Sequence, residues 1–169
     1  MRYWYDTEFI EDGKTVDLIS IGIVAEDGRE YYAISTEFNP KKASEWVKEN
    51  VLRHLPLEEA RHWKSREQIK ANLLRFIGAK DTGWVGDDKK PELWGYYSAY
   101  DHVVLCQLFG TMMELPKGWP MYTRDLKQWC DSLGNPDLPK QDKGEHHALA
   151  DAKWNRRAWE FLKEIETKK

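Results

Sequence analysis

The chain has few cysteines, no long apolar run and no excess of positive charge. It contains two cysteines, Cys106 and Cys130, each inside an apolar-periodic stretch and far from any C-x-x-C spacing. This pattern favours two buried free thiols over a disulfide or a zinc site. No segment approaches the length of a membrane-spanning helix, and the N-terminus enters a strand pattern without an apolar export segment. We therefore expect a cytoplasmic protein with no membrane partner.

The charge balance excludes a strongly basic surface. The formal net charge is -3 and the pI is about 6.0. A protein that grips a long duplex through many phosphates needs a positive field. One that takes only a strand end can let bound cations contact the phosphate. If the ligand is a nucleic acid, we expect short-range binding directed at its end.

The 169 residues show strand patterns first and helical patterns later. Strands are expected over residues 2–9, 17–25, 30–35 and 92–97. Helices are expected over residues 43–55, 65–77, 100–109, 123–133 and 147–164. This order predicts an α/β fold, a mixed sheet with helices on its faces. Because residues 1–169 contain no internal repeat and no long linker, we expect a single domain.

Asp6 and Glu8 lie two residues apart in the first expected strand. Side chains at this spacing leave the same face of a strand, roughly 6 to 7 Å apart along the backbone. Two such carboxylates can share a pair of divalent cations about 3.5 to 4 Å apart. A solvated strand face explains the pair as well. In both interpretations Thr7 points the other way.

Asp101 follows an aromatic strand and falls in the first turn of an expected helix. Sheets with helical crossovers present ligand groups near strand ends, which favours a role in binding. An acid at a helix N-terminus is also stabilised electrostatically without any ligand. Taken alone, Asp101 is explained by this second interpretation, so its meaning depends on the other acids.

Another acid, Asp151, comes five residues after His146. Five residues rotate two side chains by about 140° on one helix, so the two share no helix face. They converge only if His146 lies in the loop before the helix and folds back, a turn for which Gly144 supplies the freedom. His147 is four residues from Asp151 and would stack beside it. We interpret His147 as a surface residue near the helix start.

In chain order these residues resemble the three motifs of the DEDDh 3′-5′ exonucleases. The matching segments are Asp6-x-Glu8, Tyr97-Ser98-Ala99-Tyr100-Asp101 and His146-x-Ala148-Leu149-x-Asp151-Ala152. Residues 5–13 and 99–108 are also similar to the small bacterial polyadenylate-specific exoribonucleases, RNase AS. The chain departs from the wider family at Tyr97, where many relatives carry asparagine, and at Phe9, where deoxynucleotide-cleaving relatives often carry Thr-Thr-Gly.

The resemblance implies an RNase H-like fold with a mixed sheet of five to six strands and helices on both faces. It implies a 3′-5′ exoribonuclease that shortens single-stranded RNA, poly(A) included, to nucleoside 5′-monophosphates. It also implies a homodimer and two Mg²⁺ ions, which Mn²⁺ can replace. The implied metal ligands are all carboxylates, which suit these ions better than zinc: Asp6, Glu8, Asp101 and Asp151. Together with His146, the general base, they form the catalytic set.

Nine tryptophans are far more than chance provides. Unpaired bases are held by aromatic stacking worth about 1 to 3 kcal/mol each, but most of these rings must belong to the core. Four lie at helical spacings and are expected to pack internally or against a second subunit: Trp46, Trp129, Trp154 and Trp159. Phe9 and Tyr100 adjoin motif acids, so we expect them, with Glu8, to bind substrate.

Two classes of function remain open from the sequence. One is an active exoribonuclease, which the intact motif residues favour. The other is a non-catalytic or DNA-directed nucleic-acid-binding module, or a different metal-dependent phosphohydrolase on the same fold. Lys140 and Lys143 lie in a polar loop over residues 134–145 and would either close over the substrate backbone or remain solvated.

Overall fold

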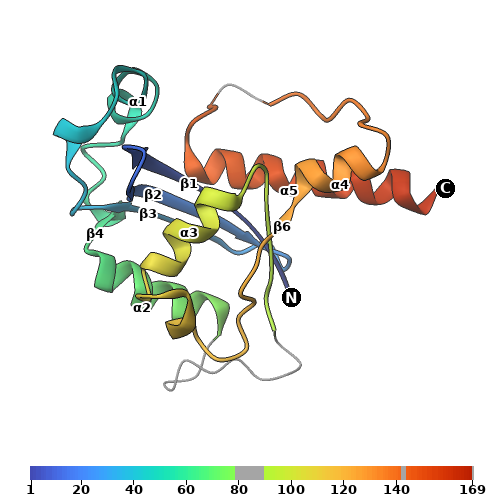
Figure 1. Ribbon diagram of the computed structural model, residues 1–169, viewed down its shortest axis with the longest axis horizontal. Coiled ribbons are helices and arrows are strands. Elements are labelled where there is room, and N and C mark those ends of the chain that lie inside the picture. The colour runs from blue at the N-terminus through green and yellow to red at the C-terminus, as the bar shows by residue number, and fades with distance from the viewer. Residues whose placement is uncertain (79–89, 142–143, 169) are drawn as a thin grey trace.

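The computed structural model describes residues 1–78, 90–141 and 144–168. A six-stranded mixed sheet lies at the centre, in the strand order β4-β3-β2-β1-β5-β6. One long helix, α5, covers one face of this sheet, and α2 and α3 cover the other (Figure 1). The α/β fold with helices on both faces is therefore confirmed, and its architecture agrees with an RNase H-like fold.

The elements have the following bounds. The strands are β1 (Arg2–Glu11), β2 (Val16–Ala25), β3 (Glu30–Ser35), β4 (Trp63–Lys64), β5 (Glu92–Gly95) and β6 (Arg124–Asp125). The α-helices are α1 (Glu45–Asn50), α2 (Arg66–Ile77), α3 (Ala99–Gln107), α4 (Leu126–Ser132) and α5 (Ala148–Thr167). The short 3-10 helices are η1 (Pro40–Lys42), η2 (Leu52–His54), η3 (Ala60–His62) and η5 (Met112–Glu114).

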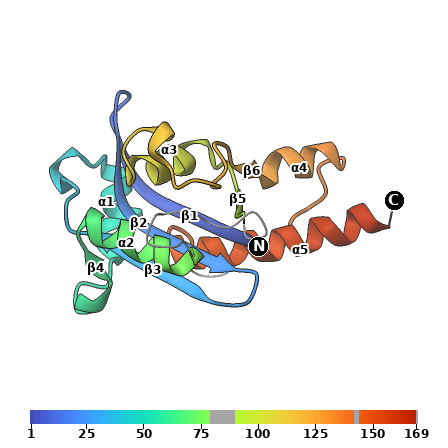
Figure 2. The ribbon, with the colours of Figure 1, turned by 90° about the horizontal axis from the view of Figure 1, so that it is seen from below.

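The alternation of side chains along β1 divides the core between the two faces of the sheet. Tyr3 and Tyr5 face α2 and α3, where they pack with aliphatic residues such as Leu73 and Leu105. Trp4, on the opposite face, packs edge-on against Trp159 of α5. Helix α5 continues past the end of the sheet toward the C-terminus, beside α4 (Figures 1 and 2). Trp4 and Asp6 therefore lie on the α5 side of the sheet, whereas Ile10, beyond an irregularity at Glu8 and Phe9, packs with Val51.

Local signals in the sequence define α2 well. Ser65 Oγ accepts a hydrogen bond from Gln68 N at 3.2 Å, and Gln68 Oε1 accepts one from Ser65 N at 2.9 Å. This capping box satisfies two N–H groups that have no partner within the helix. Gly78 ends the helix with φ of 76°, a left-handed conformation that glycine adopts without a steric penalty. The predicted start and end of α2 are both confirmed.

Three predicted elements differ from the structure. The helix expected over residues 43–55 breaks at buried Val51 into α1 and η2. The strand expected over 92–97 ends at Gly95, because Tyr97 has a left-handed φ of 53°. The helix expected over 123–133 begins at Leu126, because Asp125 caps it and pairs with β5 instead.

Predictions about single residues also met different outcomes. Cys106 and Cys130 are buried free thiols, as expected. Trp46, expected to pack internally or against a second subunit, is not packed internally: it is 54% exposed, because the short helix α1 leaves it at the surface. In the described part of the chain, no helix is long and apolar enough to cross a membrane. Lys143, in the expected polar loop, lies outside that part.

Candidate active site

Three carboxylates converge between β1 and α5. One ligand oxygen from each of Asp6, Glu8 and Asp151 lies within 4.8 Å of the other two. Asp6 and Glu8 share a face of β1, as their spacing predicts, and Asp151 belongs to the first turn of α5. The structure therefore brings together acids that are more than 140 residues apart in the sequence.

Gly22 allows α5 to approach these acids closely. It is the β2 partner of Asp6, and a Cβ atom placed on it would lie only 2.3 Å from the backbone of Ala148 and Leu149. A side chain at position 22 would push the N-terminus of α5 away from the sheet. An isolated glycine inside a strand often marks such an approach, so the sequence contained a signal that the motif analysis missed.

Asp101 reaches the site over the edge of β1. Because β5 pairs with β1 only from Arg2 to Trp4, the next residues of β1 have no strand on that side. Asp101 Oδ1 accepts hydrogen bonds from Thr7 N at 2.8 Å and Thr7 Oγ1 at 2.6 Å. Asn155 Nδ2 donates to Tyr5 O at 2.9 Å in the same region. Side chains thus replace the missing strand, and Thr7, which points away from Asp6 and Glu8 as predicted, anchors Asp101.

The turn before α5 connects His146 to Asp151. His146 N donates to Asp151 Oδ2 at 3.0 Å, and Gln141 Nε2 donates to Asp151 Oδ1. Gly144 and His146 have φ of 134° and 67°, so the chain folds back before the helix, as the motif spacing predicts. The His146 ring packs edge-on against Trp46, with ring centroids 4.7 Å apart. Neither Gln141 nor Trp46 was expected here, since neither belongs to a motif.

His147 lies at the start of α5, as expected, but it is half-buried rather than a free surface residue. Its ring stacks on Tyr32 with centroids 4.4 Å apart, and its Nδ1 is buried with no hydrogen-bond partner among the described residues. His147 precedes α5 in an extended conformation, with φ of -119°. Desolvation lowers the pKa of its imidazole. His147 therefore fixes the start of α5 against β3 while His146 lies on the other side of the turn.

The pKa of every motif carboxyl is raised. Burial is the largest cause in each case, and it raises the pKa of Glu8 to about 8 and those of Asp101 and Asp151 to about 6. The pKa of Asp6 is raised well above its ordinary value by burial and then by repulsion from Asp101, Glu8 and Asp151. Within residues 1–78, 90–141 and 144–168, no lysine or arginine forms an ion pair with these acids. An oxygen-lined cluster of uncompensated negative charge fits one or more divalent cations.

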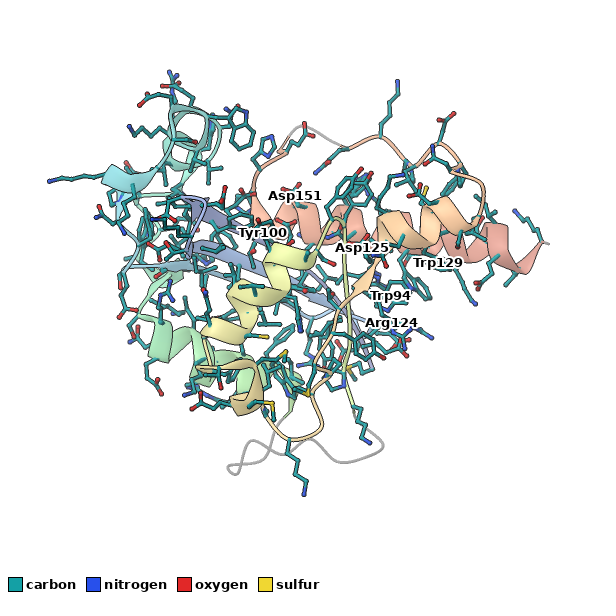
Figure 3. All side chains as sticks on the ribbon, viewed as in Figure 1. Trp94, Tyr100, Arg124, Asp125, Trp129 and Asp151 are labelled. Carbon is teal, nitrogen blue, oxygen red and sulfur yellow. The ribbon has the colours of Figure 1, made fainter. Side chains whose placement is uncertain are left out.

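Aromatic side chains border the acids on the α3 side. Phe9 and Tyr100 stack with ring centroids 5.8 Å apart and an interplanar angle of 27°. Tyr100 is 51% exposed and Tyr97 is 64% exposed. Figure 3 shows Tyr100 on α3 and Asp151 on α5. The residues that the sequence suggested for substrate binding, Glu8, Phe9 and Tyr100, therefore adjoin the carboxylates.

The sheet and the acidic centre define an α/β protein of the RNase H-like kind. The model of one family, the 3′-5′ exoribonuclease Rv2179c-like domain, matches residues 1–163. The chain belongs to this family. The expectation of a 3′-5′ exonuclease, based on motif resemblance, is thus confirmed at the level of the family.

Two curated relatives come from Mycobacterium tuberculosis. They are 3′-5′ exoribonuclease MT2234.1 from strain CDC 1551 / Oshkosh and 3′-5′ exoribonuclease Rv2179c from strain ATCC 25618 / H37Rv. Each is 50% identical to this chain over 153 residues, which cover 90% of this chain and 88% of the relative. The similarity therefore extends over most of both chains rather than over a single motif.

Proposed function

We propose that this protein is a magnesium-dependent 3′-5′ exoribonuclease that releases nucleoside 5′-monophosphates from single-stranded RNA. The observation that carries this proposal is the convergence of Asp6, Glu8 and Asp151, with Asp101 beside them, in a half-buried cluster that no lysine or arginine of the described residues pairs with. Family membership and the names of the two relatives support the reaction and the RNA substrate. The resemblance to the polyadenylate-specific group makes poly(A) the first substrate to test, and a homodimer the expected assembly.

Two Mg²⁺ ions, replaceable by Mn²⁺, are the cofactors of the proposed reaction. Asp6, Glu8, Asp101 and Asp151 would hold them, and the hydrogen bonds from Thr7 would fix the carboxylate of Asp101 beside the other three. When bound, such ions supply a Lewis acid for the attacking water and for the charge on the phosphodiester. The protein contributes a preformed array of oxygens, and a bound cation relieves the repulsion among them when they are ionised.

His146 is the proposed general base that accepts the proton of the attacking water. Its backbone N–H is bound to Asp151, so its position is tied to that carboxylate. Trp46 packs against its ring and restricts the directions in which the side chain can turn. General-base assistance of this kind is worth about 10² to 10⁴ in rate.

Phe9 and Tyr100 form the proposed platform for the terminal base, next to Glu8. Their rings are already stacked on each other, and the face of Tyr100 is half exposed. A nucleobase that stacks on Tyr100 would place its 3′-terminal phosphodiester at the adjacent acids. Base stacking of this kind is tolerant of sequence and is worth about 1 to 3 kcal/mol.

A cleavage assay with three substrates in parallel tests the proposal. Poly(A), mixed-sequence RNA and DNA, each single-stranded and labelled at the 3′ end, are incubated with Mg²⁺ or with EDTA. The expected result is release of mononucleotides from both RNAs, faster than from DNA, and none in EDTA. RNA binding without any cleavage would instead indicate a non-catalytic module, and equal or faster cleavage of DNA would overturn the RNA assignment.

A further inference from the structure

A groove of about 640 Å³ lies at the β5–β6 end of the sheet, apart from the carboxylates. We call it the aromatic groove and define it by five of its lining residues: Trp94, Tyr122, Arg124, Trp129 and Trp159. Figure 3 shows Trp94, Arg124 and Trp129 gathered near β6 and α4, with Asp151 and Tyr100 of the acidic centre in the same view. The proposed cleavage mechanism uses none of the five.

The indole rings of the groove are held in fixed orientations. Trp94 Nε1 donates to Glu92 Oε2 at 3.2 Å, and Trp129 Nε1 donates to Glu166 Oε1 at 3.2 Å. The two ring centroids are 5.3 Å apart, and both rings also pack against Trp159. The N–H groups of Trp94 and Trp129 are therefore bound, and that of Trp159 is buried without a partner among the described residues. Arg2 lies over the Trp159 ring, so the most exposed ring face of the groove belongs to Tyr122, at 58%. Such a face suits the stacking of any base, without selection for its sequence.

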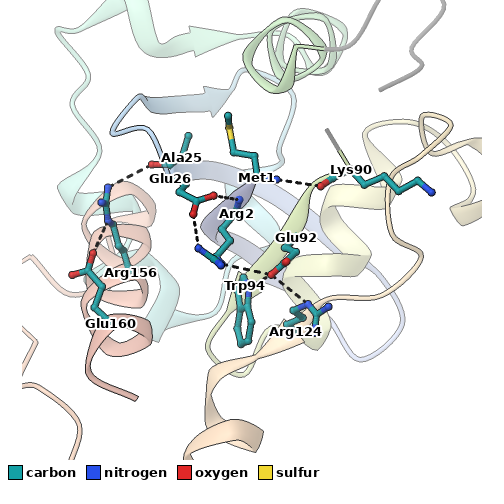
Figure 4. Close-up of polar contacts among 10 residues, drawn as sticks. All are labelled: Met1, Arg2, Ala25, Glu26, Lys90, Glu92, Trp94, Arg124, Arg156 and Glu160. Carbon is teal, nitrogen blue, oxygen red and sulfur yellow. Dashed lines mark hydrogen bonds and ion pairs between the residues drawn. The ribbon is translucent and has the colours of Figure 1, made fainter. Parts of the chain in front are cut away.

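Arg124 places a positive charge among these rings. Its guanidinium lies 5.5 Å from the centroid of Trp94 and 5.9 Å from that of Tyr122. Its ion pair with Glu92 is long, at 3.8 Å, and Glu92 also faces Arg2 (Figure 4). The side chain of Arg124 is 43% exposed. This long contact with Glu92 is weaker than a close bidentate contact between a guanidinium and a phosphate. Arg124 can therefore bind a phosphate.

The acids of the groove already have partners inside the protein. Glu92 and Glu166 hold the two indoles, and Asp125 accepts hydrogen bonds from Lys127 N at 2.8 Å and Gln128 N at 3.1 Å. Lys163 Nζ also pairs with Glu166 Oε2, at 2.6 Å, but 47% of its side chain remains exposed. Single-stranded nucleic acid binds to aromatic ring faces and to exposed cations. The groove offers both, and its acids are already hydrogen-bonded within the protein.

Hydrogen bonds connect the lining of the groove to the helix that carries Asp101. Asp125, which lines the groove, accepts hydrogen bonds from Ser98 N at 2.8 Å and from Ser98 Oγ at 3.2 Å. Ser98 caps the start of α3, and that helix carries Tyr100 and Asp101 in its first turn. A strand whose 3′ end lies at the acids would therefore reach the groove past the N-terminus of α3.

We propose that the aromatic groove is a second binding site, which stacks bases of single-stranded RNA upstream of the 3′ end being cleaved. The proposal rests on the proposed exoribonuclease function and adds the place where the body of the substrate is held. It explains how a protein of net charge -3 binds RNA with few cations. It also predicts that long substrates bind better than dinucleotides, which occupy the acidic centre alone.

Steady-state kinetics on a dinucleotide and on a 12-nucleotide RNA test this site. Tyr122→Ala and Arg124→Ala should raise KM for the longer RNA about tenfold, the loss of roughly one stacked base, while kcat and the dinucleotide KM stay unchanged. Tyr122→Phe keeps the ring and should retain the wild-type KM. Arg61→Ala is the matched control, because Arg61 is an arginine 78% exposed in η3, toward the β4 edge of the sheet.

A KM that does not change with either alanine variant, or that rises equally for both substrates, would overturn the second site. Light scattering that shows a wild-type dimer and a monomeric Tyr122→Ala variant would also overturn it and assign the surface to contacts between copies of this chain. Fluorescence anisotropy of the labelled 12-mer in EDTA needs no cleavage. Weaker binding by Arg124→Ala in that assay would support the second site. Absence of cleavage by the wild-type protein would refute the proposed exoribonuclease function but not the second site.

Discussion

The two halves of β1 lie under the same helix but are held in different ways. In its aromatic half, Arg2–Trp4, the backbone pairs with β5 and Trp4 packs against Trp159 at 5.5 Å between centroids. In its acidic half, Asp6–Glu8, the strand has lost its β5 partner, and carboxylates take the places of packed rings on the same face. One half stabilises the fold through burial of apolar surface. The other opposes folding until a cation arrives.

This contrast shows how the fold accommodates a cluster of acids that lowers its stability. Burial and mutual repulsion raise the pKa values of the acids, which means that their charged forms are disfavoured in the folded protein. The neighbouring rings, together with Asn155 and Asp101 at the open strand edge, keep the backbone in place. The site can therefore be formed before metal binds, and substitutions in the two halves should have opposite effects.

The largest expected effect comes from the acidic half. Asp6→Ala and Asp151→Ala should abolish cleavage, because each removes an oxygen ligand that no other described residue replaces. Neither variant should unfold the metal-free protein, since each also removes repulsion. Mononucleotide release from 3′-labelled RNA and thermal unfolding in EDTA measure the two effects. Wild-type activity in either variant would contradict the proposed role of these acids.

Substitutions of the two adjacent histidines, His146 and His147, should affect activity and stability differently. His146→Ala should lower kcat by about 10² to 10⁴, leaving a residue of activity that improves at higher pH, where hydroxide replaces the base. His147→Ala should retain activity in its folded fraction but unfold more easily, because His147 stacks on Tyr32. An active His146 variant beside a folded but inactive His147 variant would reverse the assignment.

In the aromatic half, substitution should affect stability alone. Trp4→Ala should lower the free energy of unfolding by about 3 to 5 kcal/mol, because Trp4 is fully buried beneath α5. Trp46→Ala is a matched control, since Trp46 is 54% exposed and should cost less than about 0.5 kcal/mol. Urea denaturation in EDTA compares the two variants. Equal losses of stability in the Trp4 and Trp46 variants would contradict the claim that only the buried ring stabilises the fold.

A smaller effect is expected in the pH dependence of stability. The raised pKa values mean that the folded metal-free protein binds more protons than the unfolded chain between their ordinary values, near 4, and about 8 for Glu8. The contribution of these groups to stability is therefore present at low pH and is lost as the pH rises through this range.

Urea denaturation from pH 5 to pH 8, with EDTA or with Mg²⁺, measures this dependence. Bound Mg²⁺ should flatten the decline, because it binds only the ionised carboxylates. Glu8→Gln should also flatten it in EDTA, since glutamine carries no charge. A metal-free protein that becomes more stable across this pH range would contradict the repulsion assigned to the acidic half.

Local periodicity explains which parts of the site were predictable. The two-residue spacing of Asp6 and Glu8 places them on one face of any strand, and the capping box at Ser65 acts within a single turn. The return of His146 toward Asp151 also follows from a spacing that no continuous helix accommodates. Each of these predictions needed only neighbouring residues.

Contacts between distant segments were not predictable in the same way. Thr7 anchors Asp101 only because β5 ends at Gly95. The sequence did not predict this end, because the aromatic residues continue to Tyr97. His147 stacks on a tyrosine more than 110 residues earlier in the chain. Trp46 has the spacing of a core residue, but the break at Val51 leaves it at the surface, against His146. Tertiary packing decides all of these positions.

Crystals soaked in Mn²⁺ and measured at its absorption edge test most directly whether the acidic half of β1 is a metal centre. The account predicts two anomalous peaks about 3.5 to 4 Å apart, ligated by Asp6, Glu8, Asp101 and Asp151. The same soak of Asp6→Ala crystals should lose at least one peak. A wild-type map at saturating Mn²⁺ with no peak against these carboxylates would contradict the account.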